Sequence, residues 1–149
     1  MTTYYEEYTV GDSWEFGEET VTKAEIIEFA EKYDPQPMHV DEAAAAESMF
    51  GGLIASGWQT AAICMRMFVE NRIDDASKGA RGVDKLRWIR PLRPGDTLSA
   101  TAEVVDKYPD DENREIGYVD TKLTAYNQND EAVISWIGLE IVEREPETS

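Results

Sequence analysis

The chain has 149 residues, of which 42% are hydrophobic, and this length is sufficient for one domain with a buried core. Its 31 acidic residues outnumber 14 basic ones, for a formal net charge of −17. Such a surface repels nucleic acids and anionic membranes, so neither is an expected partner. Acidic residues are spread along the whole sequence, which favours adaptation to high salt; an acidic protein from an ordinary habitat is the alternative.

The single cysteine, Cys64, excludes an intrachain disulfide, and no Cys/His cluster has the spacing of metal ligands, so we expect no metal site. The N-terminus lacks the basic and apolar segments of a signal peptide. The longest apolar stretch, residues 58–69, is too short to span a membrane. We therefore expect a soluble, cytoplasmic protein with a single domain over residues 1–149, whose last residues, about 145–149, form a frayed tail.

The first predicted elements are a short strand and two helices. Residues 8–16 predict a turn and a strand. A helix then begins after Thr22, which can form a capping box with Glu25, and it ends before Pro35. Residues 41–50, DEAAAAESMF, predict a second, short helix.

A longer helix is predicted over about Ser56–Asn71. Ser56 and Gln59 have the spacing of another capping box. The residues that follow are apolar on nearly every side, and a helix of that kind is normally buried. In a domain of this size, burial on all sides requires a sheet that wraps around the helix.

Four strands are predicted in the second half, at residues 82–92, 96–108, 115–128 and 131–144. Turn sequences such as RPGD, YPDDEN and NQND separate most of them. Long sequential antiparallel strands around one apolar helix define an α+β arrangement, and they match the architecture called the hot-dog fold.

The only histidine, His39, lies in the segment YDPQPMHVDE at residues 33–42. Pro35 and Pro37 restrict the backbone between Asp34 and His39, so the separation of these two side chains loses much of its freedom. Such rigidity suits an acid–base pair that must be held in position. A purely structural turn explains the same residues, and both interpretations stay open at this point.

The segment GGLIASGWQT, residues 51–60, leads into the long helix. A glycine there can simply allow a tight entry to the helix. Alternatively Gly57, which has no Cβ, leaves its amide N–H accessible to a ligand oxygen at the positive end of the helix dipole. Together with Asp34 and His39, that amide would complete a base, an acid and an oxyanion donor.

These residues also carry a resemblance to a known family. The sequence FAEKYDPQPMHVDEAAAA resembles the hydratase-2 motif of the MaoC-like dehydratase family, which is related to (R)-specific enoyl-CoA hydratases. Residues 50–70 resemble the family's hot-dog helix with its preceding loop, and residues 88–98 resemble the strand and turn that follow. The residues that match the motif are Phe29, Ala30, Asp34, Gln36, Pro37, His39 and Asp41.

The resemblance implies a reversible addition of water across the C2–C3 double bond of an enoyl-CoA thioester. Asp34 and His39 would activate the water, and the Gly57 amide would stabilise the enolate-like oxygen. CoA would enter only as part of the substrate, without another cofactor. We take Gln36, Ser56 and Trp58 as substrate-contacting residues; Gln36 and Ser56 replace an Asn and a His that are common in the better-known hydratases, which leaves the acyl group open.

An anionic CoA substrate requires positive charge at the entrance to the site. The densest basic cluster comprises Arg81, Lys85, Arg87, Arg90 and Arg93. We expect Arg87, Arg90 and Arg93 to contact the substrate; the alternative is that the cluster only balances the acidic surface.

Two other functions remain possible from the sequence, a hot-dog thioesterase and a non-catalytic subunit that binds acyl thioesters. The local pairing of Asp34 with His39 argues against the first, and the presence of both groups argues against the second. An isolated hot-dog sheet has exposed edges, so we expect at least a homodimer.

Overall fold

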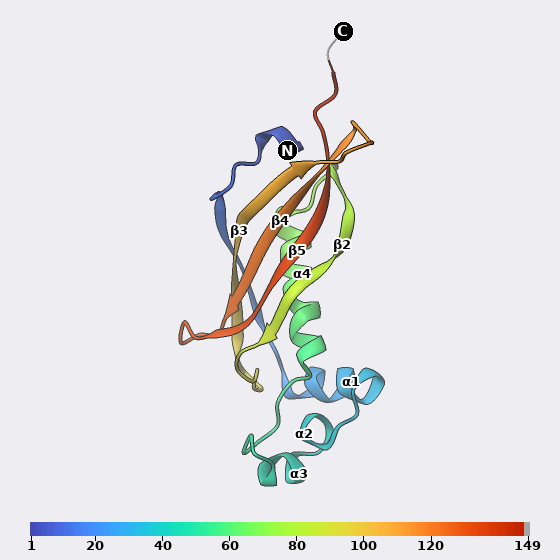
Figure 1. Ribbon diagram of the computed structural model, residues 1–149. Helices are drawn as coiled ribbons and strands as arrows, with labels where there is room; N and C mark the ends of the chain where they lie inside the picture. Colours follow the sequence, from blue (N-terminus) through green and yellow to red (C-terminus); the bar gives the residue numbers. More distant parts are fainter. Residues whose placement is uncertain (148–149) are drawn as a thin grey trace.

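The computed structural model describes residues 1–147. Five strands form one antiparallel sheet in the order β1-β3-β4-β5-β2, so β1 and β2 are its edges. The sheet curves around the long helix α4, and this confirms the α+β hot-dog arrangement (Figure 1). The elements are η1 (Tyr5–Glu7), β1 (Ser13–Thr20), α1 (Lys23–Tyr33), α2 (Pro37–Val40), α3 (Glu42–Glu47), α4 (Gly57–Arg72), β2 (Ser77–Trp88), β3 (Thr97–Pro109), β4 (Ile116–Tyr126) and β5 (Ala132–Glu143).

The core lies between α4 and the concave face of the sheet. Alternate residues of β3 and β4 are buried there, and they pair across the strands, as Ala102 does with Leu123. Cys64 and Met67 of α4 pack against them and are at most 1% exposed. Burial also raises the pKa of the Cys64 thiol to about 12, which makes it an inert core residue.

The prediction that α4 is buried on every side is wrong for the single chain. Trp58, Met65 and Val69 are 57%, 43% and 47% exposed, whereas the polar Gln59 and Thr60 are buried. The sheet covers only one side of the helix, and edge strand β2 is exposed along most of its length. The amino-acid composition of α4 could not show which side of the helix the sheet covers.

The helix starts follow the predicted capping chemistry in part. Thr22 and Glu25 form the expected capping box at α1, and α1 ends at Tyr33 before Pro35. Ser56 caps α4 by accepting a hydrogen bond from the Trp58 amide. Its predicted capping box with Gln59 is wrong, because the Gln59 side chain instead donates to the carbonyl of Glu25 on α1.

Other boundaries also differ from the predictions. The first strand is Ser13–Thr20 rather than residues 8–16, and β2 is Ser77–Trp88 rather than residues 82–92. β2 contains three register shifts, which explains why its hydrophobic alternation is hard to read. In the predicted tail, the Glu145 amide is hydrogen-bonded to the Glu6 carboxylate, and residues 148–149 lie outside the described residues.

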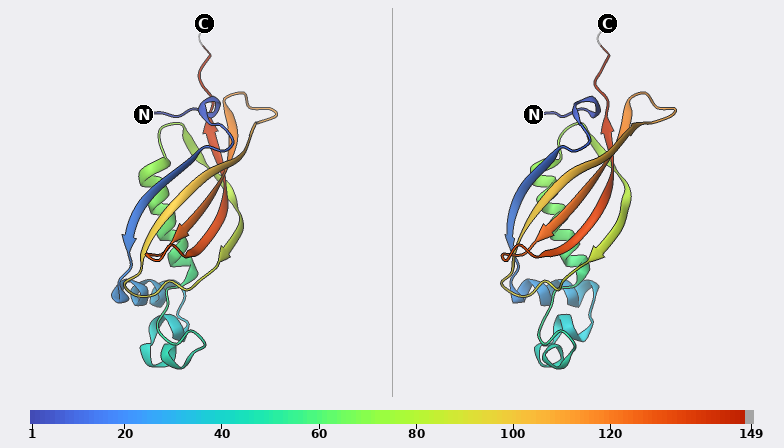
Figure 2. Two further views of the ribbon diagram at one scale, coloured as in Figure 1. Left: turned by 90° about the vertical axis from the view of Figure 1, so that its left-hand side faces the viewer. Right: turned by 60° about the vertical axis from the view of Figure 1, so that its left-hand side comes forward.

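Helices α1, α2 and α3 gather beyond one end of the sheet, beside the N-terminus of α4 (Figures 1 and 2). Pro37 occupies the first turn of α2, where its missing N–H costs nothing, and Asp41 caps α3 through the amides of Ala43 and Ala44. The segment that connects them to α4 is fixed by two backbone bonds, from Ile54 to Met38 and from Ala55 to Leu92. Within residues 1–147, no helix is long and apolar enough to cross a membrane.

One carboxyl group, that of Glu140, faces the concave side of the sheet among apolar side chains. Burial raises the pKa of Glu140 to about 7 from its ordinary 4.5. The folded protein therefore holds the proton more tightly than the unfolded chain does. The stability associated with this proton is fully present below pH 4.5, and it is lost as the pH rises through 7.

Replacing Glu140 by Gln, which is neutral at every pH, should therefore raise the free energy of unfolding at pH 8 by about 1–3 kcal/mol. At pH 4.5 the difference should be close to zero. Denaturant unfolding at both pH values measures it, and Glu103→Gln on the exposed face of β3 serves as the control. Equal stability of wild type and Glu140→Gln at pH 8 would contradict the prediction.

Candidate active site

Asp34 and His39 come together at the end of α4. Asp34 is the C-terminal cap of α1, and His39 lies in the single turn of α2. Their side chains are 18% and 5% exposed, and the Oδ2 atom of Asp34 lies 3.4 Å from Nε2 of His39. The segment with Pro35 and Pro37 thus brings the two candidate acid–base groups together, and the His39 side chain is buried.

The Asp34 carboxylate receives two hydrogen bonds from neighbouring side chains. The Ser56 hydroxyl donates to Oδ2 at 2.7 Å, and the Gln36 amide donates to Oδ1 at 2.8 Å. The bond from Ser56 is the largest influence on the Asp34 pKa, and despite opposing desolvation these bonds and nearby His39 hold it below its usual value. Asp34 is thus kept ionised.

The orientation of His39 fixes which nitrogen is free. Its Nδ1 atom lies 2.8 Å from the carbonyl oxygen of Ile54. A carbonyl can only accept, so Nδ1 carries the hydrogen and the lone pair of a neutral ring is on Nε2, which faces Asp34. Two hydrogen-bond acceptors then face each other, an arrangement that can share a donor such as water.

A pocket of about 400 Å³ opens over this pair. Trp58 and Trp88 stand at one side, with ring centroids 5.1 Å apart in an edge-to-face arrangement. The rest of the lining is mainly apolar, with the Gln36 and Thr60 side chains as polar exceptions besides the acid–base pair and Arg90. The other lining residues are Met38, Phe50, Ile54, Ala55, Gly57, Ile89, Pro91 and Leu92.

Gly57 lies at the first position of α4 and lines the same pocket. Within residues 1–147 its amide N–H has no intramolecular acceptor, as expected for a candidate oxyanion donor. The lack of a Cβ also has a packing reason, because a Cβ at this position would lie 2.3 Å from the Trp88 indole. The sequence indicated the oxyanion donor and, as the alternative, a tight entry to the helix, but it gave no sign of the contact with Trp88.

The structure separates the predicted substrate-contacting residues. Gln36 and Trp58 line the pocket, whereas Ser56 is fully buried and acts on Asp34. The prediction that Ser56 contacts the substrate is therefore wrong; it positions a catalytic candidate.

The basic cluster does not gather at the pocket. Arg90 lines it, although its guanidinium lies 3.4 Å from Glu131. Arg93 instead donates to the Phe50 carbonyl and fixes the loop before α4, and Arg87 donates to the Leu86 carbonyl without lining the pocket. Arg81 stacks on Tyr118, 3.8 Å from its ring centre, and belongs to a different part of the sheet.

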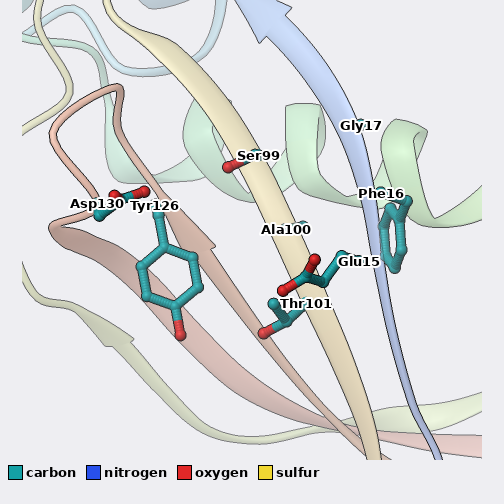
Figure 3. A pocket seen from close by; sticks show the side chains of 8 residues that line it. All are labelled: Glu15, Phe16, Gly17, Ser99, Ala100, Thr101, Tyr126 and Asp130. Atoms are coloured by element: carbon teal, nitrogen blue, oxygen red, sulfur yellow. The ribbon is translucent and has the colours of Figure 1, made fainter.

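A wider hollow of about 560 Å³ lies on the outer face of the sheet, across β1, β3 and the end of β4 (Figure 3). Its polar groups include the carboxylates of Glu15 and Asp130 and the hydroxyls of Thr101 and Tyr126. None of these groups is paired with a histidine or with a helix N-terminus. The outer hollow therefore lacks the combination of carboxylate, histidine and helix amide found in the pocket at Asp34. The smaller pocket is the candidate active site.

Among the contributors to the site that were not predicted are the Ile54 carbonyl and the Trp88 ring. The first is a backbone atom, and its position depends on the bonds that pin residues 54 and 55. The second lies at the end of an edge strand, where the sequence pattern indicated only a strand residue. Neither leaves a signal in the sequence.

Removal of the Ser56 hydroxyl should raise the pKa of Asp34, because the charged carboxylate loses the hydrogen bond that stabilises it most. In Ser56→Ala the acid limb of the pH profile of kcat/KM, measured for the hydration expected from the family resemblance, should therefore move to higher pH. Carboxyl NMR of Asp34 gives the pKa directly. Ser99→Ala on the outer face of the sheet is the control, and an unshifted Asp34 pKa in Ser56→Ala would contradict the assignment.

A curved antiparallel sheet around one helix defines a hot-dog protein, and Asp34, His39 and the free Gly57 amide form its candidate site. A family model described as "MaoC like domain" matches residues 6–127, and the chain belongs to this family. The fold is shared with a Mycobacterium tuberculosis protein whose structure has a double hot-dog fold, at a TM-score of 0.80 and 15% identity, covering 99% of this chain and 46% of that one.

Individual relatives support the same placement. The crystal structure of a MaoC-like dehydratase from Rhodospirillum rubrum has a TM-score of 0.90 and 37% identity, over 97% of this chain and 99% of that one. An (R)-hydratase, PhaJ1 from Pseudomonas aeruginosa, has a TM-score of 0.73 and 26% identity, over 98% and 91% of the two chains. The uncharacterized protein YdeM of Bacillus subtilis is 37% identical over 84% of this chain and 88% of its own length. Hydration or dehydration is therefore supported at the level of the family.

Proposed function

We propose that this protein is an enoyl-CoA hydratase or dehydratase in which Asp34 and His39 activate the water. The observation that carries the proposal is the approach of two hydrogen-bond acceptors, Asp34 Oδ2 and His39 Nε2, to 3.4 Å in a mainly apolar pocket. A water molecule can donate one hydrogen to each of them. Its oxygen lone pair is then free to attack an electrophilic carbon.

In the hydration direction, the water oxygen forms a bond to C3 while one proton passes to the acid–base pair. The C2–C3 π electrons move towards the thioester carbonyl, whose oxygen gains negative charge. A proton from the pair then reaches C2, and both groups return to their starting protonation states. Dehydration follows the same steps in reverse.

The developing oxyanion needs a fixed donor, and the Gly57 amide is suited to this role. It sits at the positive end of the 16-residue helix α4 and faces the pocket. Its position beside His39 would allow one substrate to contact the amide through its carbonyl and the water through C3. Ser56 and Gln36 would hold the carboxylate between them.

The substrate side of the proposal is a thioester of CoA with an apolar acyl group. Apolar walls and the two tryptophans favour such a group, and Arg90 is the basic side chain best placed to meet the CoA phosphates. Roles for Arg87 and Arg93 in phosphate binding remain predictions. The Arg93 guanidinium already donates a hydrogen bond to the Phe50 carbonyl in the loop before α4. We also propose a homodimer, because β2 presents an unpaired edge and α4 an exposed apolar side.

The test incubates the purified protein with trans-2-butenoyl-CoA and trans-2-hexenoyl-CoA in buffers of low and high salt. Loss of the enoyl absorbance measures hydration, and a thiol reagent measures hydrolysis of the thioester in parallel. We expect hydration without thiol release. Thiol release would support the thioesterase alternative instead, and binding without either reaction would support a non-catalytic acyl-binding subunit.

A further inference from the structure

The segment between α3 and α4 contributes one wall of the candidate active site. We call residues 48–52 the Phe50 loop, because Phe50 lines the pocket. The chain is anchored in the core on both sides of the loop, at the fully buried Ala45 and at Leu53, which is 6% exposed. Between these anchors the loop lies at the surface, and Met49 is 92% exposed.

The hydrogen bonds within the Phe50 loop are local. The amide and the hydroxyl of Ser48 both donate to the Ala45 carbonyl, the Phe50 amide donates to the Ser48 hydroxyl, and the Gly51 amide donates to the Ser48 carbonyl. The Phe50 ring is only partly buried, and within residues 1–147 it does not belong to the core cluster around α4. Bonds of this kind shape the loop without fixing its position over the pocket.

One long-range hydrogen bond joins the loop to the rest of the protein. Nη2 of Arg93 donates to the Phe50 carbonyl oxygen at 2.7 Å, across 43 residues of sequence. In the described part of the chain, no other hydrogen bond links the loop to a residue outside it and α3. The guanidinium also lies beside Gly52, where a Cβ would be 3.5 Å from Nη1. A bond from a charged donor at this length is a strong one.

Arg93 is itself well anchored, as the first residue of the RPGD turn between β2 and β3. Its amide donates to Oδ2 of Asp96 at 2.9 Å, and the Asp96 amide donates back to the Arg93 carbonyl. Two further bonds fasten the turn to the buried Val21, from the Gly95 amide and to the Asp96 carbonyl. The turn is therefore a fixed point from which the Arg93 side chain reaches the loop.

We propose that Arg93 is a positioning residue for the candidate active site: its bond to the Phe50 carbonyl holds the Phe50 ring in the pocket wall, where the ring contacts the bound thioester. The proposal rests on the proposed function, because it takes a CoA thioester as the ligand. The ring contributes to affinity only while the loop is in place. Loss of the bond therefore lowers the affinity in proportion to the time that the wall is displaced.

Direct contact between Arg93 and the CoA phosphates is the alternative role for this exposed side chain. Arg93 does not line the pocket, and its guanidinium already has the Phe50 carbonyl as a partner. The two roles have different requirements. A phosphate contact needs phosphates in the ligand, whereas a role through the loop needs the Phe50 ring.

The experiment measures the dissociation constants of butanoyl-CoA and of butanoyl-pantetheine, which has no phosphate, by calorimetry. Both are saturated and cannot be hydrated, so binding is measured apart from catalysis. We expect Arg93→Ala to raise both constants by a similar factor, about three- to tenfold, as the loss of one charge-assisted hydrogen bond implies. Phe50→Ala should raise both about tenfold through the lost apolar contact. In the Phe50→Ala background, Arg93→Ala should add almost nothing, because its effect passes through the ring.

Arg114→Ala is the control, since it removes the same charge from the exposed turn between β3 and β4, and it should match the wild type. Amide hydrogen exchange of the Phe50 loop in the free protein should be faster in Arg93→Ala and unchanged in Arg114→Ala.

Weaker binding of butanoyl-CoA alone would overturn the proposal in favour of a phosphate contact. Additive effects of Arg93→Ala and Phe50→Ala would overturn it as well. If the wild type bound neither thioester, this proposal and the proposed function would both fail. The expected changes in binding without hydration of an enoyl-CoA would refute the proposed function alone.

Discussion

Asp34→Asn should reduce kcat/KM for hydration of an enoyl-CoA by about 10²–10⁴, and His39→Ala should have an effect of the same order. Asparagine has nearly the size of aspartate and can still accept a hydrogen bond from Ser56. It carries no charge, however, and cannot take a proton from water. The loss should therefore appear in kcat more than in KM, and the thermal unfolding midpoint should change little.

A matched control for this variant is Asp41→Asn, nearby in the chain. Asp41 is exposed and caps α3, a role that asparagine fills equally well. Activity close to that of the wild type is expected. If Asp34→Asn kept more than a tenth of the wild-type kcat/KM, Asp34 would not be the group that activates the water.

Gly57→Ala should lower kcat by about 10², because the new methyl group displaces the Trp88 ring and crowds the amide that faces the pocket. The exposed Trp88 side chain can swing away, so the protein should still fold, with a lower unfolding midpoint. Steady-state kinetics and thermal unfolding are measured on the same preparation.

The double variant Gly57→Ala/Trp88→Ala separates the two roles of the glycine. Removing the indole relieves the clash, so the double variant should lose no more stability than Trp88→Ala alone does. If catalysis requires the accessible amide of residue 57, the kcat of the double variant should stay low. Full recovery of kcat relative to Trp88→Ala would mean that Gly57 serves packing only.

Much of the fold could be predicted from local features of the sequence. The strands β3 and β4 alternate clearly between buried and less buried residues over most of their length, and helix α1 has a capping box at its start and a proline after its end. Such signals depend on neighbours in the chain. β2 gave a weaker signal, because its glycines, register shifts and exposed surface obscure the alternation.

The candidate site was predicted as a set of residues but not as a geometry. The prolines around Gln36 indicated a restricted separation of Asp34 and His39, and the structure places Oδ2 and Nε2 of these side chains 3.4 Å apart. Ser56 was assigned to the substrate, at the position where the better-known hydratases often have a histidine. Its hydroxyl instead points to Asp34, 22 residues earlier, a contact that no local pattern encodes.

The sequence by itself indicated the family, the hot-dog architecture and the candidate pair Asp34 and His39, since all three depend on residue types at short spacings. The tertiary structure alone decided the free nitrogen of His39, which follows from the Ile54 carbonyl, and the partners of Asp34. It also decided which side of α4 stays open and that Glu140 faces an apolar cavity between α4 and β2. These features depend on how distant segments pack, and packing is set by the whole chain rather than by any one stretch of it.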